Sequence, residues 1–136
     1  MILSKHRILV VDDVPASAKT LAVMLHAIGQ EVEMCTDGAA ALEMARQFLP
    51  HVIFLDIGMP QTDGYEVARR LRQIQEVKSA TLIALTSYGQ EEDRRRALEA
   101  GFNYHWVKPT SIEALEQLIS QMPEEQSQRA VSQPSA

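Results

Sequence analysis

The sequence contains a single cysteine, no long apolar run and no excess of positive charge. With Cys35 alone, the chain cannot form a disulfide framework or a metal site built from several thiolates, and this composition suits a reducing compartment. No run approaches the roughly 20 apolar residues that cross a bilayer, and the opening MILSKHR lacks the apolar segment of a signal peptide. We therefore expect a soluble cytoplasmic protein with no membrane partner.

The charge distribution argues against nucleic-acid binding. The formal net charge is -5, and no basic stripe stands out. The one dense basic run, at 94–96, directly follows the acidic run at 91–93, so the two nearly cancel and we expect a solvated helix face. A chain of 136 residues is long enough for one domain with its own core.

Short apolar runs alternate with segments of helical periodicity five times, as in βα units built around a parallel sheet. Pro15 suits the first turn of the first helix, and Gly29 suits its C-terminal end. Pro50 stops the second helix, and Gly101 closes the fourth. The expected strands are 7–11, 31–35, 52–55, 81–85 and 104–107, and the helices carry their apolar faces at 21–28, 41–49, 67–74, 90–100 and 112–122.

The second apolar run differs from the others, because Val32 and Met34 alternate with two glutamates. Alternation indicates one wet face and therefore an edge strand, whereas the third and fourth runs are almost wholly apolar. An edge position for the second strand, with right-handed crossovers, favours a doubly wound α/β fold. We expect a five-stranded parallel sheet in the flavodoxin-like order 2-1-3-4-5, covered by five helices.

After Met122 the apolar pattern ends. Residues 123–136, PEEQSQRAVSQPSA, are polar and poor in large apolar side chains, so we expect a disordered tail. The folded domain is expected to span residues 1–122.

Five polar side chains stand where the predicted strands end: Asp12, Asp13, Asp56, Thr86 and Lys108. Strands one and three are neighbours in the expected order, and ligands of such sheets bind beyond the strand ends at this reversal point. Two like charges about 4 Å apart repel by about 4 kcal/mol at an effective dielectric constant of about 20, so the paired aspartates call for a cation. Oxygen ligands without sulfur or imidazole suit Mg²⁺, or Mn²⁺ in its place.

Two structural interpretations of these loops stay open. Asp13 stands just before Pro15 and can cap the first helix instead of binding a metal. The dipeptide Asp63-Gly64 is typical of a turn, and its aspartate is expected to cap the third helix.

Four motifs together resemble the receiver domain of two-component response regulators, and they are VVDD, LDIGMPQTDGYEV, ALTSYG and HWVKP. They stand in the order and spacing of that family, and the resemblance covers residues 6–121. It implies that a histidine kinase or a histidine phosphotransfer protein phosphorylates Asp56. It also implies that Mg²⁺ is held by Asp12, Asp13, Asp56 and the backbone carbonyl of Gly58.

The same resemblance assigns roles around Lys108. Lys108 pairs with the phosphoryl group, Thr86 turns its hydroxyl toward that group, and Lys108-Pro109 is expected to be a cis peptide. His105 stands where the family usually places a Tyr or Phe that swings inward behind the threonine. The alternative for His105 is an edge-strand residue that faces water.

Gly58 and Tyr88 occupy positions where receivers that lose phosphate quickly resemble one another in carrying polar side chains. Gly58 has no side chain to orient water, and the ring of Tyr88 can exclude it, so we expect a long-lived phosphoryl-aspartate. Faster hydrolysis, through a site opened by the missing side chain of Gly58, is the rival expectation.

Two other classes share part of this pattern. A haloacid-dehalogenase-like phosphatase also uses a strand-end Asp with Mg²⁺, but it needs a second Asp two positions on, where this chain has Gly58. A flavin carrier needs a hydroxyl-rich phosphate loop after the first strand, where Asp12 and Asp13 would repel the flavin phosphate.

We therefore expect a signalling module that assists its own phosphorylation and dephosphorylation and is not otherwise an enzyme. We expect no second domain after the fifth helix, which favours a single-domain regulator or a phosphorelay intermediate. The alternative is a receiver excised from a hybrid histidine kinase. The downstream protein partner and the pathway are left open.

Overall fold

The structure, a computed structural model, describes residues 3–60, 62–87, 91–108 and 110–122. Five parallel strands form one sheet in the order β2-β1-β3-β4-β5, which confirms the expected fold. The strands are β1 (Arg7–Val11), β2 (Glu31–Cys35), β3 (Val52–Asp56), β4 (Thr81–Thr86) and β5 (Tyr104–Val107). The helices are α1 (Pro15–Ala27), α2 (Gly38–Phe48), α3 (Gly64–Arg72), α4 (Glu91–Ala100) and α5 (Ile112–Ser120).

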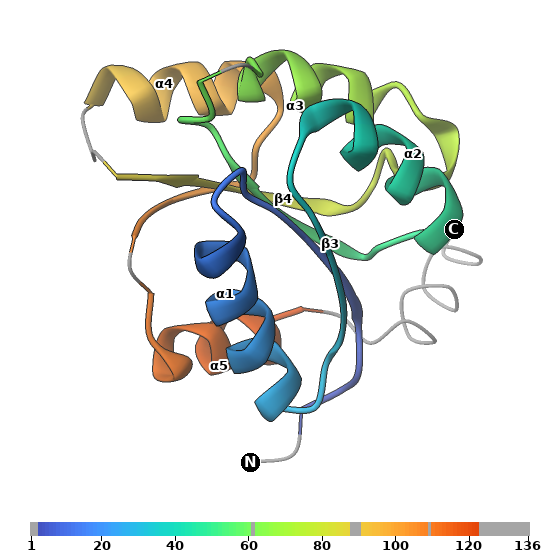
Figure 1. Cartoon of the computed structure of the whole chain (residues 1–136), viewed down its shortest axis with the longest axis vertical. Coiled ribbons are helices and arrows are strands. Elements are labelled where there is room, and N and C mark those ends of the chain that lie inside the picture. Colours follow the sequence, from blue (N-terminus) through green and yellow to red (C-terminus); the bar gives the residue numbers. More distant parts are fainter. Residues whose placement is uncertain (1–2, 61, 88–90, 109, 123–136) are drawn as a thin grey trace, which may run out of the picture.

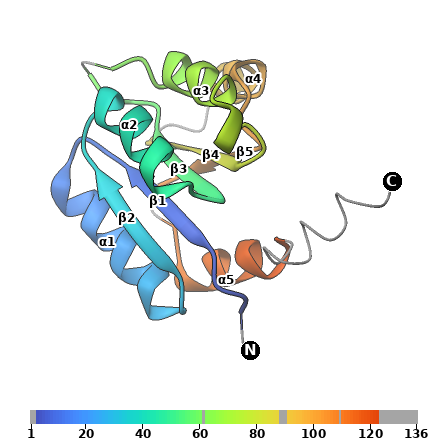
Figure 2. The ribbon, with the colours of Figure 1, turned by 90° about the vertical axis from the view of Figure 1, so that its right-hand side faces the viewer.

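The sheet lies between two layers of helices (Figure 1). α1 and α5 cover one face, and α2, α3 and α4 cover the other, as the turned view in Figure 2 also shows. Because side chains alternate across a strand, β1 sends Ile8 and Val10 into the core beside α1 and α5, and Leu9 and Val11 into the core on the opposite face. The central strand β3 is buried along its whole length.

The strands begin and end close to their predicted positions, while four of the helices end one or two residues before their predicted apolar faces do. β3 and β4 are each one residue longer than expected, so Asp56 and Thr86 are the last residues of their strands. The predicted apolar face of the third helix reaches Ile74, but α3 ends at Arg72. Ile74 enters the core just before a short 3-10 helix, η1 (Gln75–Val77), that the periodicity does not predict.

Arg72 accounts for the chain path after α3. Its guanidinium donates to the carbonyl oxygens of Lys78 and Ala80 at 2.8 and 2.6 Å, and to the carbonyl oxygen of Gly101 at 2.6 and 2.9 Å. Because these acceptors belong to the segments leading into β4 and β5, one side chain ties both segments to the end of α3.

β2 is an edge strand, as expected, but its alternation holds only in part. Val32 packs against the core beside α1 and α5, whereas Met34, on the same face, is 43% exposed. Cys35 packs against the opposite core. The helices cover an edge strand only in part, so neither face of β2 is fully buried.

Helix ends settle the two open structural interpretations. Val14, and not Asp13, is the N-cap of α1, so the capping alternative for Asp13 is wrong. Asp63 does cap α3, because its carboxylate accepts hydrogen bonds from the N–H groups of Tyr65 and Glu66.

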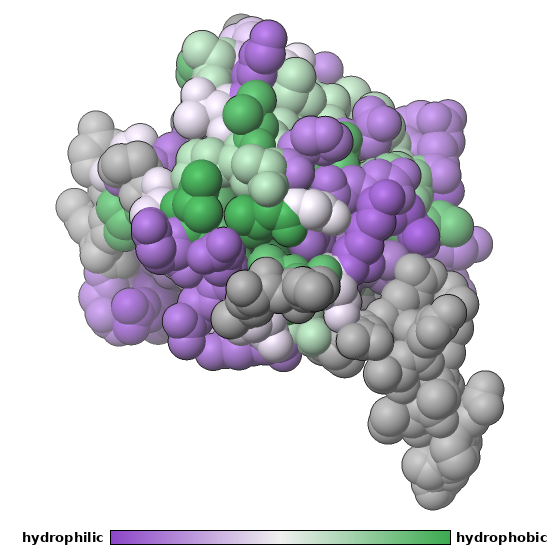
Figure 3. Space-filling model, turned by 90° about the horizontal axis from the view of Figure 1, so that it is seen from below, coloured by the Kyte–Doolittle hydropathy of each residue, from purple (hydrophilic) through white to green (hydrophobic). Residues whose placement is uncertain are grey.

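The surface beside α1 and α5 carries apolar residues among polar ones (Figure 3). Val23 of α1 is 57% exposed, and Ile112 at the start of α5 is 38% exposed. α1 therefore carries an apolar side chain outside the face that it buries.

Within the described residues, no helix is both long enough and apolar enough to cross a membrane. The segment 123–136, expected to be a disordered tail, lies outside the described residues.

Candidate functional site

The predicted site residues meet at one end of the sheet. β1 ends directly before Asp12, β3 ends with Asp56, β4 ends with Thr86, and β5 ends directly before Lys108. Parallel strands bring their carboxyl ends to the same edge of a sheet, so residues as far apart in the chain as Asp12 and Lys108 become neighbours. Asp12, Asp56 and Thr86 are buried, while the Lys108 side chain is 24% exposed.

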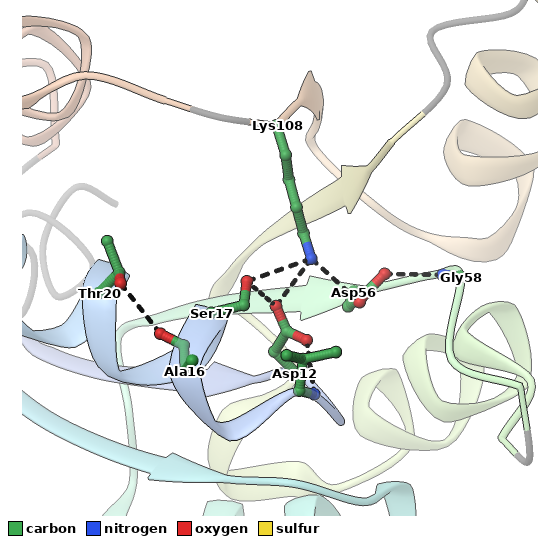
Figure 4. A network of polar contacts seen from close by, with 8 residues as sticks. Asp12, Ala16, Ser17, Thr20, Asp56, Gly58 and Lys108 are labelled. Atoms are coloured by element: carbon green, nitrogen blue, oxygen red, sulfur yellow. Dashed lines mark hydrogen bonds and ion pairs between the residues drawn. The ribbon is translucent and has the colours of Figure 1, made fainter.

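Lys108 joins two of these carboxylates (Figure 4). Its Nζ donates to Oδ2 of Asp12 at 2.7 Å and to Oδ2 of Asp56 at 3.1 Å. Its backbone N–H donates to the carbonyl oxygen of Thr86 at 2.8 Å, which anchors the residue to the end of β4. One ammonium group thus links the ends of β1 and β3 through charge-assisted hydrogen bonds, which are roughly twice as strong as neutral ones.

Backbone and hydroxyl donors hold the other carboxylate contacts. The N–H of Gly58 donates to Oδ1 of Asp56 at 2.8 Å, and the N–H of Val14 donates to Oδ1 of Asp12 at 3.0 Å. Ser17, in the first turn of α1, donates its Oγ to Oδ2 of Asp12 at 2.6 Å. The motifs do not single out Ser17. The start of α1 three residues after Asp12 is the sequence signal that places this turn beside the strand end.

The two buried carboxylates differ in pKa. Burial raises the pKa of Asp56 above its ordinary value, and hydrogen bonds from Gly58 and Lys108 offset this only in part. Burial acts in the same direction on Asp12, but hydrogen bonds from Lys108 and Ser17 outweigh it, so the pKa of Asp12 lies below its ordinary value. Burial acts to lower the pKa of Lys108, yet the two carboxylates raise it overall. Asp12 is therefore the more firmly ionised carboxylate of the pair.

Three carboxylates lie close enough to share a cation. Asp12, Asp13 and Asp56 each offer one oxygen, and these three oxygens lie within 4.8 Å of one another. A set of oxygen donors suits Mg²⁺, which takes one or two carboxylates together with waters and a phosphate. The residues therefore fit the predicted ion. The ligand role of the Gly58 carbonyl stays a prediction, because the contact seen for Gly58 is made by its N–H.

His105 turns toward α4. Its neighbour Trp106 packs into the core beside α1 and α5, and the centroids of the Trp106 and Phe54 rings are 6.2 Å apart. Because side chains alternate along β5, His105 lies on the opposite face of the sheet. The Nε2 atom of His105 is buried and has no hydrogen-bond partner among the described residues. Burial lowers the pKa of His105, and the charge of Arg94 on α4 lowers it further. The residue as a whole is half-buried, so the water-facing alternative and the switch role of His105 both stay predictions.

Two predicted residues, Tyr88 and Pro109, lie outside the described residues. The cis peptide at Lys108-Pro109, and the influence of Gly58 and Tyr88 on the phosphoryl lifetime, therefore stay predictions.

Sequence comparison relates residues 8–120 to the family described as the response regulator receiver domain. The uncharacterized 14.6 kDa protein in the sodA1 3′ region of Leptolyngbya boryana is 37% identical over 119 residues, which cover 88% of this chain and 91% of that protein. The chain spans less than half the length of the transcriptional regulators that it also matches.

Solved structures of similar proteins share the fold. The receiver domain of the sensor histidine kinase PA1611 from Pseudomonas aeruginosa PAO1, which has a magnesium ion coordinated in its active site cleft, is 29% identical with a TM-score of 0.77, over 85% of this chain and 95% of that one. The chemotaxis response regulator CheY4 of Vibrio cholerae is 28% identical with a TM-score of 0.78, over 85% of this chain and 96% of that one. The family match covers the part of the chain that holds every residue of the site.

Proposed function

The chain belongs to the response regulator receiver family of two-component signalling, and we propose that its Asp56 accepts a phosphoryl group from a histidine kinase or a histidine phosphotransfer protein. The position of Lys108 carries this proposal, because its Nζ lies 2.7 Å from Asp12 and 3.1 Å from Asp56. An ammonium group held beside a strand-end carboxylate stabilises the negative charge of a phosphoryl group as it arrives.

The proposed reaction is a nucleophilic displacement at phosphorus. An oxygen of Asp56 attacks the phosphorus of a phosphohistidine, and a new O–P bond forms as the P–N bond breaks. The electron pair of the broken bond stays with the imidazole, which takes up a proton. The attacking carboxylate must be ionised, and Lys108 favours that form against the effect of burial on the pKa of Asp56. The hydrogen bond from Gly58 holds Oδ1 of Asp56 and so orients the group for attack.

Asp12, Asp13 and Asp56 would hold Mg²⁺, or Mn²⁺ in its place, during this reaction. When bound, the ion supplies charge neutralisation for the phosphoryl oxygens. The three carboxylates also repel one another, so a shared cation removes a cost that they would otherwise carry together.

Phosphorylation is proposed to change the surface beside β5. It raises the negative charge on Asp56 from one to about two and adds acceptor oxygens, to which Thr86 and Lys108 can donate. Thr86 pairs in register with Val107 of β5, which is 47% exposed. A shift of Thr86 would therefore act directly on an exposed strand, with His105 following on the side toward α4.

In this proposal the domain is a cytoplasmic signalling module that assists only its own phosphorylation and dephosphorylation. The match over 91% of the Leptolyngbya protein supports a single-domain regulator or a phosphorelay intermediate. The likeness to a sensor kinase's receiver supports the alternative of a hybrid kinase. Its downstream partner is proposed to be another protein.

Phosphorylation of the purified protein with phosphoramidate and Mg²⁺, followed by intact-mass measurement, tests the proposal. A single phosphoryl adduct is expected on the wild type and none on Asp56→Asn. Asp63→Asn is the matched control, because Asp63 caps α3 and asparagine also caps helices, so this variant should be phosphorylated like the wild type. An equal adduct on Asp56→Asn would show that another residue is the acceptor, and a rate unchanged by EDTA would contradict the metal's role.

A further inference from the structure

Ser17 lies where the acidic pair and the lysine meet. Its Oγ donates to Oδ2 of Asp12 at 2.6 Å, and Nζ of Lys108 approaches the same Oγ at 3.4 Å (Figure 4). Lys108 itself donates to the same Oδ2 at 2.7 Å. One carboxylate oxygen of Asp12 therefore receives two side-chain donors at once, one neutral and one charged.

This oxygen needs a donor at all times, because the residue that carries it is buried. Asp12 is only 1% exposed, and its other oxygen is held by the N–H of Val14. A buried carboxylate oxygen that loses its donors is destabilised, because it gives up its strongest hydrogen bonds.

We propose that Ser17 is a positioning residue, whose hydroxyl keeps Asp12 hydrogen-bonded while Lys108 moves from Asp12 to the phosphoryl group on Asp56. This inference rests on the proposed function, in which Lys108 donates a hydrogen bond to the phosphoryl group. The Nζ atom already lies 3.1 Å from Asp56, so a short movement toward a phosphoryl oxygen lengthens its contact with Asp12. Ser17 remains in place, because it belongs to the first turn of α1 and does not move with Lys108.

Space for this movement exists beside the three residues. A cavity of about 230 Å³ is bounded by Asp12, Ser17 and Lys108 on its polar side and by Leu21, Met24 and Leu85 on its apolar side. The Lys108 side chain is therefore not locked by packing, and its position is decided mainly by which oxygens accept from it.

Removal of the Ser17 hydroxyl has a specific consequence. Among the described residues, Lys108 would then be the one side chain still donating to Oδ2 of Asp12. Lys108 would be held to Asp12 more tightly, and its transfer to the phosphoryl group would leave that oxygen without a side-chain hydrogen-bond donor even when the carboxylate also contacts Mg²⁺. The cost appears only when a phosphoryl group or its mimic competes for Lys108, and not when the metal alone binds.

Calorimetric titration of the full chain separates these two events. Mg²⁺ alone and beryllofluoride in saturating Mg²⁺ are titrated into the wild type, Ser17→Ala, Ser17→Thr and Thr20→Ala. Ser17→Ala should weaken beryllofluoride binding about tenfold, as expected for the loss of one charge-assisted hydrogen bond, and change Mg²⁺ affinity less than about twofold. Ser17→Thr restores the hydroxyl and should recover beryllofluoride binding.

Thr20→Ala is the matched control. Thr20 lies one turn further along α1 and borders the same cavity, but its hydroxyl donates to the carbonyl oxygen of Ala16 at 2.9 Å and not to a carboxylate. It should bind both ligands like the wild type. Ser17→Cys, which keeps the size of the side chain with a weaker donor, should fall between Ser17→Ala and the wild type, and it replaces Ser17→Ala if thermal melting shows that the alanine variant is unfolded.

Three results would overturn the inference. Wild-type affinity for beryllofluoride in Ser17→Ala shows that the hydroxyl is dispensable. Equal weakening of Mg²⁺ and beryllofluoride shows that Ser17 supports the site only structurally. The same loss in Thr20→Ala shows that the effect belongs to α1 as a whole. Absence of beryllofluoride binding in the wild type would instead overturn the proposed function on which the inference rests.

Discussion

At the scale of single residues, two aspartates at the same end of the sheet acquire opposite pKa shifts. Both are buried and both accept from Lys108. Asp12 accepts additionally from a hydroxyl and a backbone N–H, whereas the further donor seen for Asp56 is the backbone N–H of Gly58. The described contacts therefore stabilise the ionised carboxylate of Asp56 less than that of Asp12. A less stabilised carboxylate suits the residue that is proposed to react.

Asp56→Asn is expected to stabilise the metal-free domain by about 1 kcal/mol at neutral pH. The pKa of Asp56 is raised in the folded state, so its ionised carboxylate disfavours folding at every pH above the folded pKa. Below the ordinary Asp pKa of about 3.9 the group is protonated in both states, and the gain should disappear. Urea unfolding of both proteins over a pH series, with EDTA present, measures the difference.

Asp12→Asn is expected to change the free energy of unfolding in the opposite direction. The pKa of Asp12 is lowered in the folded state, so its charge contributes stability above the ordinary Asp pKa, and this contribution is lost as the pH falls through the folded pKa. The variant should be less stable at neutral pH by about 1–2 kcal/mol, with the loss fading in acid. Shifts of the same sign for both variants at neutral pH would contradict the asymmetry seen in their contacts.

At the scale of elements, the start of α3 determines where the chain leaves β3. A Cβ atom at Gly64 would lie 2.8 Å from Cα of Ile57 and 3.2 Å from the carbonyl oxygen of Asp56. At Gly58 the nearest atom to an added Cβ would be Oδ1 of Asp56, at an ordinary 3.4 Å. Helix α3 therefore approaches the backbone beyond Asp56 as closely as a residue without a side chain permits.

Gly64→Ala is expected to destabilise the domain by about 2 kcal/mol and to slow phosphorylation, because the backbone beside Asp56 must shift to admit the methyl group. Gly58→Ala, in the same loop, should cost less than about 1 kcal/mol because its methyl group finds room. Urea unfolding and the rate of phosphorylation by phosphoramidate are measured for both variants. Equal effects on stability would show that the close approach of α3 does not constrain the strand end.

At the scale of the whole molecule, β5 connects the site with the outer edge of the sheet. The strand pairs in register with β4 up to Thr86 and leads directly into Lys108. Its central residues lie on opposite faces of the sheet, with Trp106 against Phe54 on one face and His105 toward α4 on the other. A change in the contacts of Thr86 or Lys108 is therefore expected to reach both helical layers through one strand.

Trp106 fluorescence is expected to report this change. Addition of beryllofluoride with Mg²⁺ should shift the emission of Trp106, because the ring is half-buried two residues before Lys108 and its packing depends on the position of β5. The fluorescence change should saturate at the same concentration as calorimetric binding and be absent in Asp56→Asn. Binding without any change in emission would mean that β5 stays rigid, and the predicted switch at His105 would fail with it.

Local patterns were enough to predict most of the fold. The strands follow from short apolar runs bounded by Gly, Pro and polar residues, and the edge position of β2 follows from its glutamates. The candidate site follows from the same runs, since Asp12, Asp56 and Lys108 stand at strand ends that a parallel sheet must bring together. These features depend on residues close in the chain, which is why periodicity reveals them.

The sequence by itself thus determined the sheet order, the family and the residues that gather beyond the strands. Only the tertiary structure decided the end of α3 at Arg72 and the contact of Ser17 with Asp12. Each of these depends on where a polar side chain finds its partner, as Arg72 does at Gly101, 29 positions away. Hydrogen bonds require distances within a few tenths of an ångström of about 3 Å, and only the packed core positions distant segments so closely.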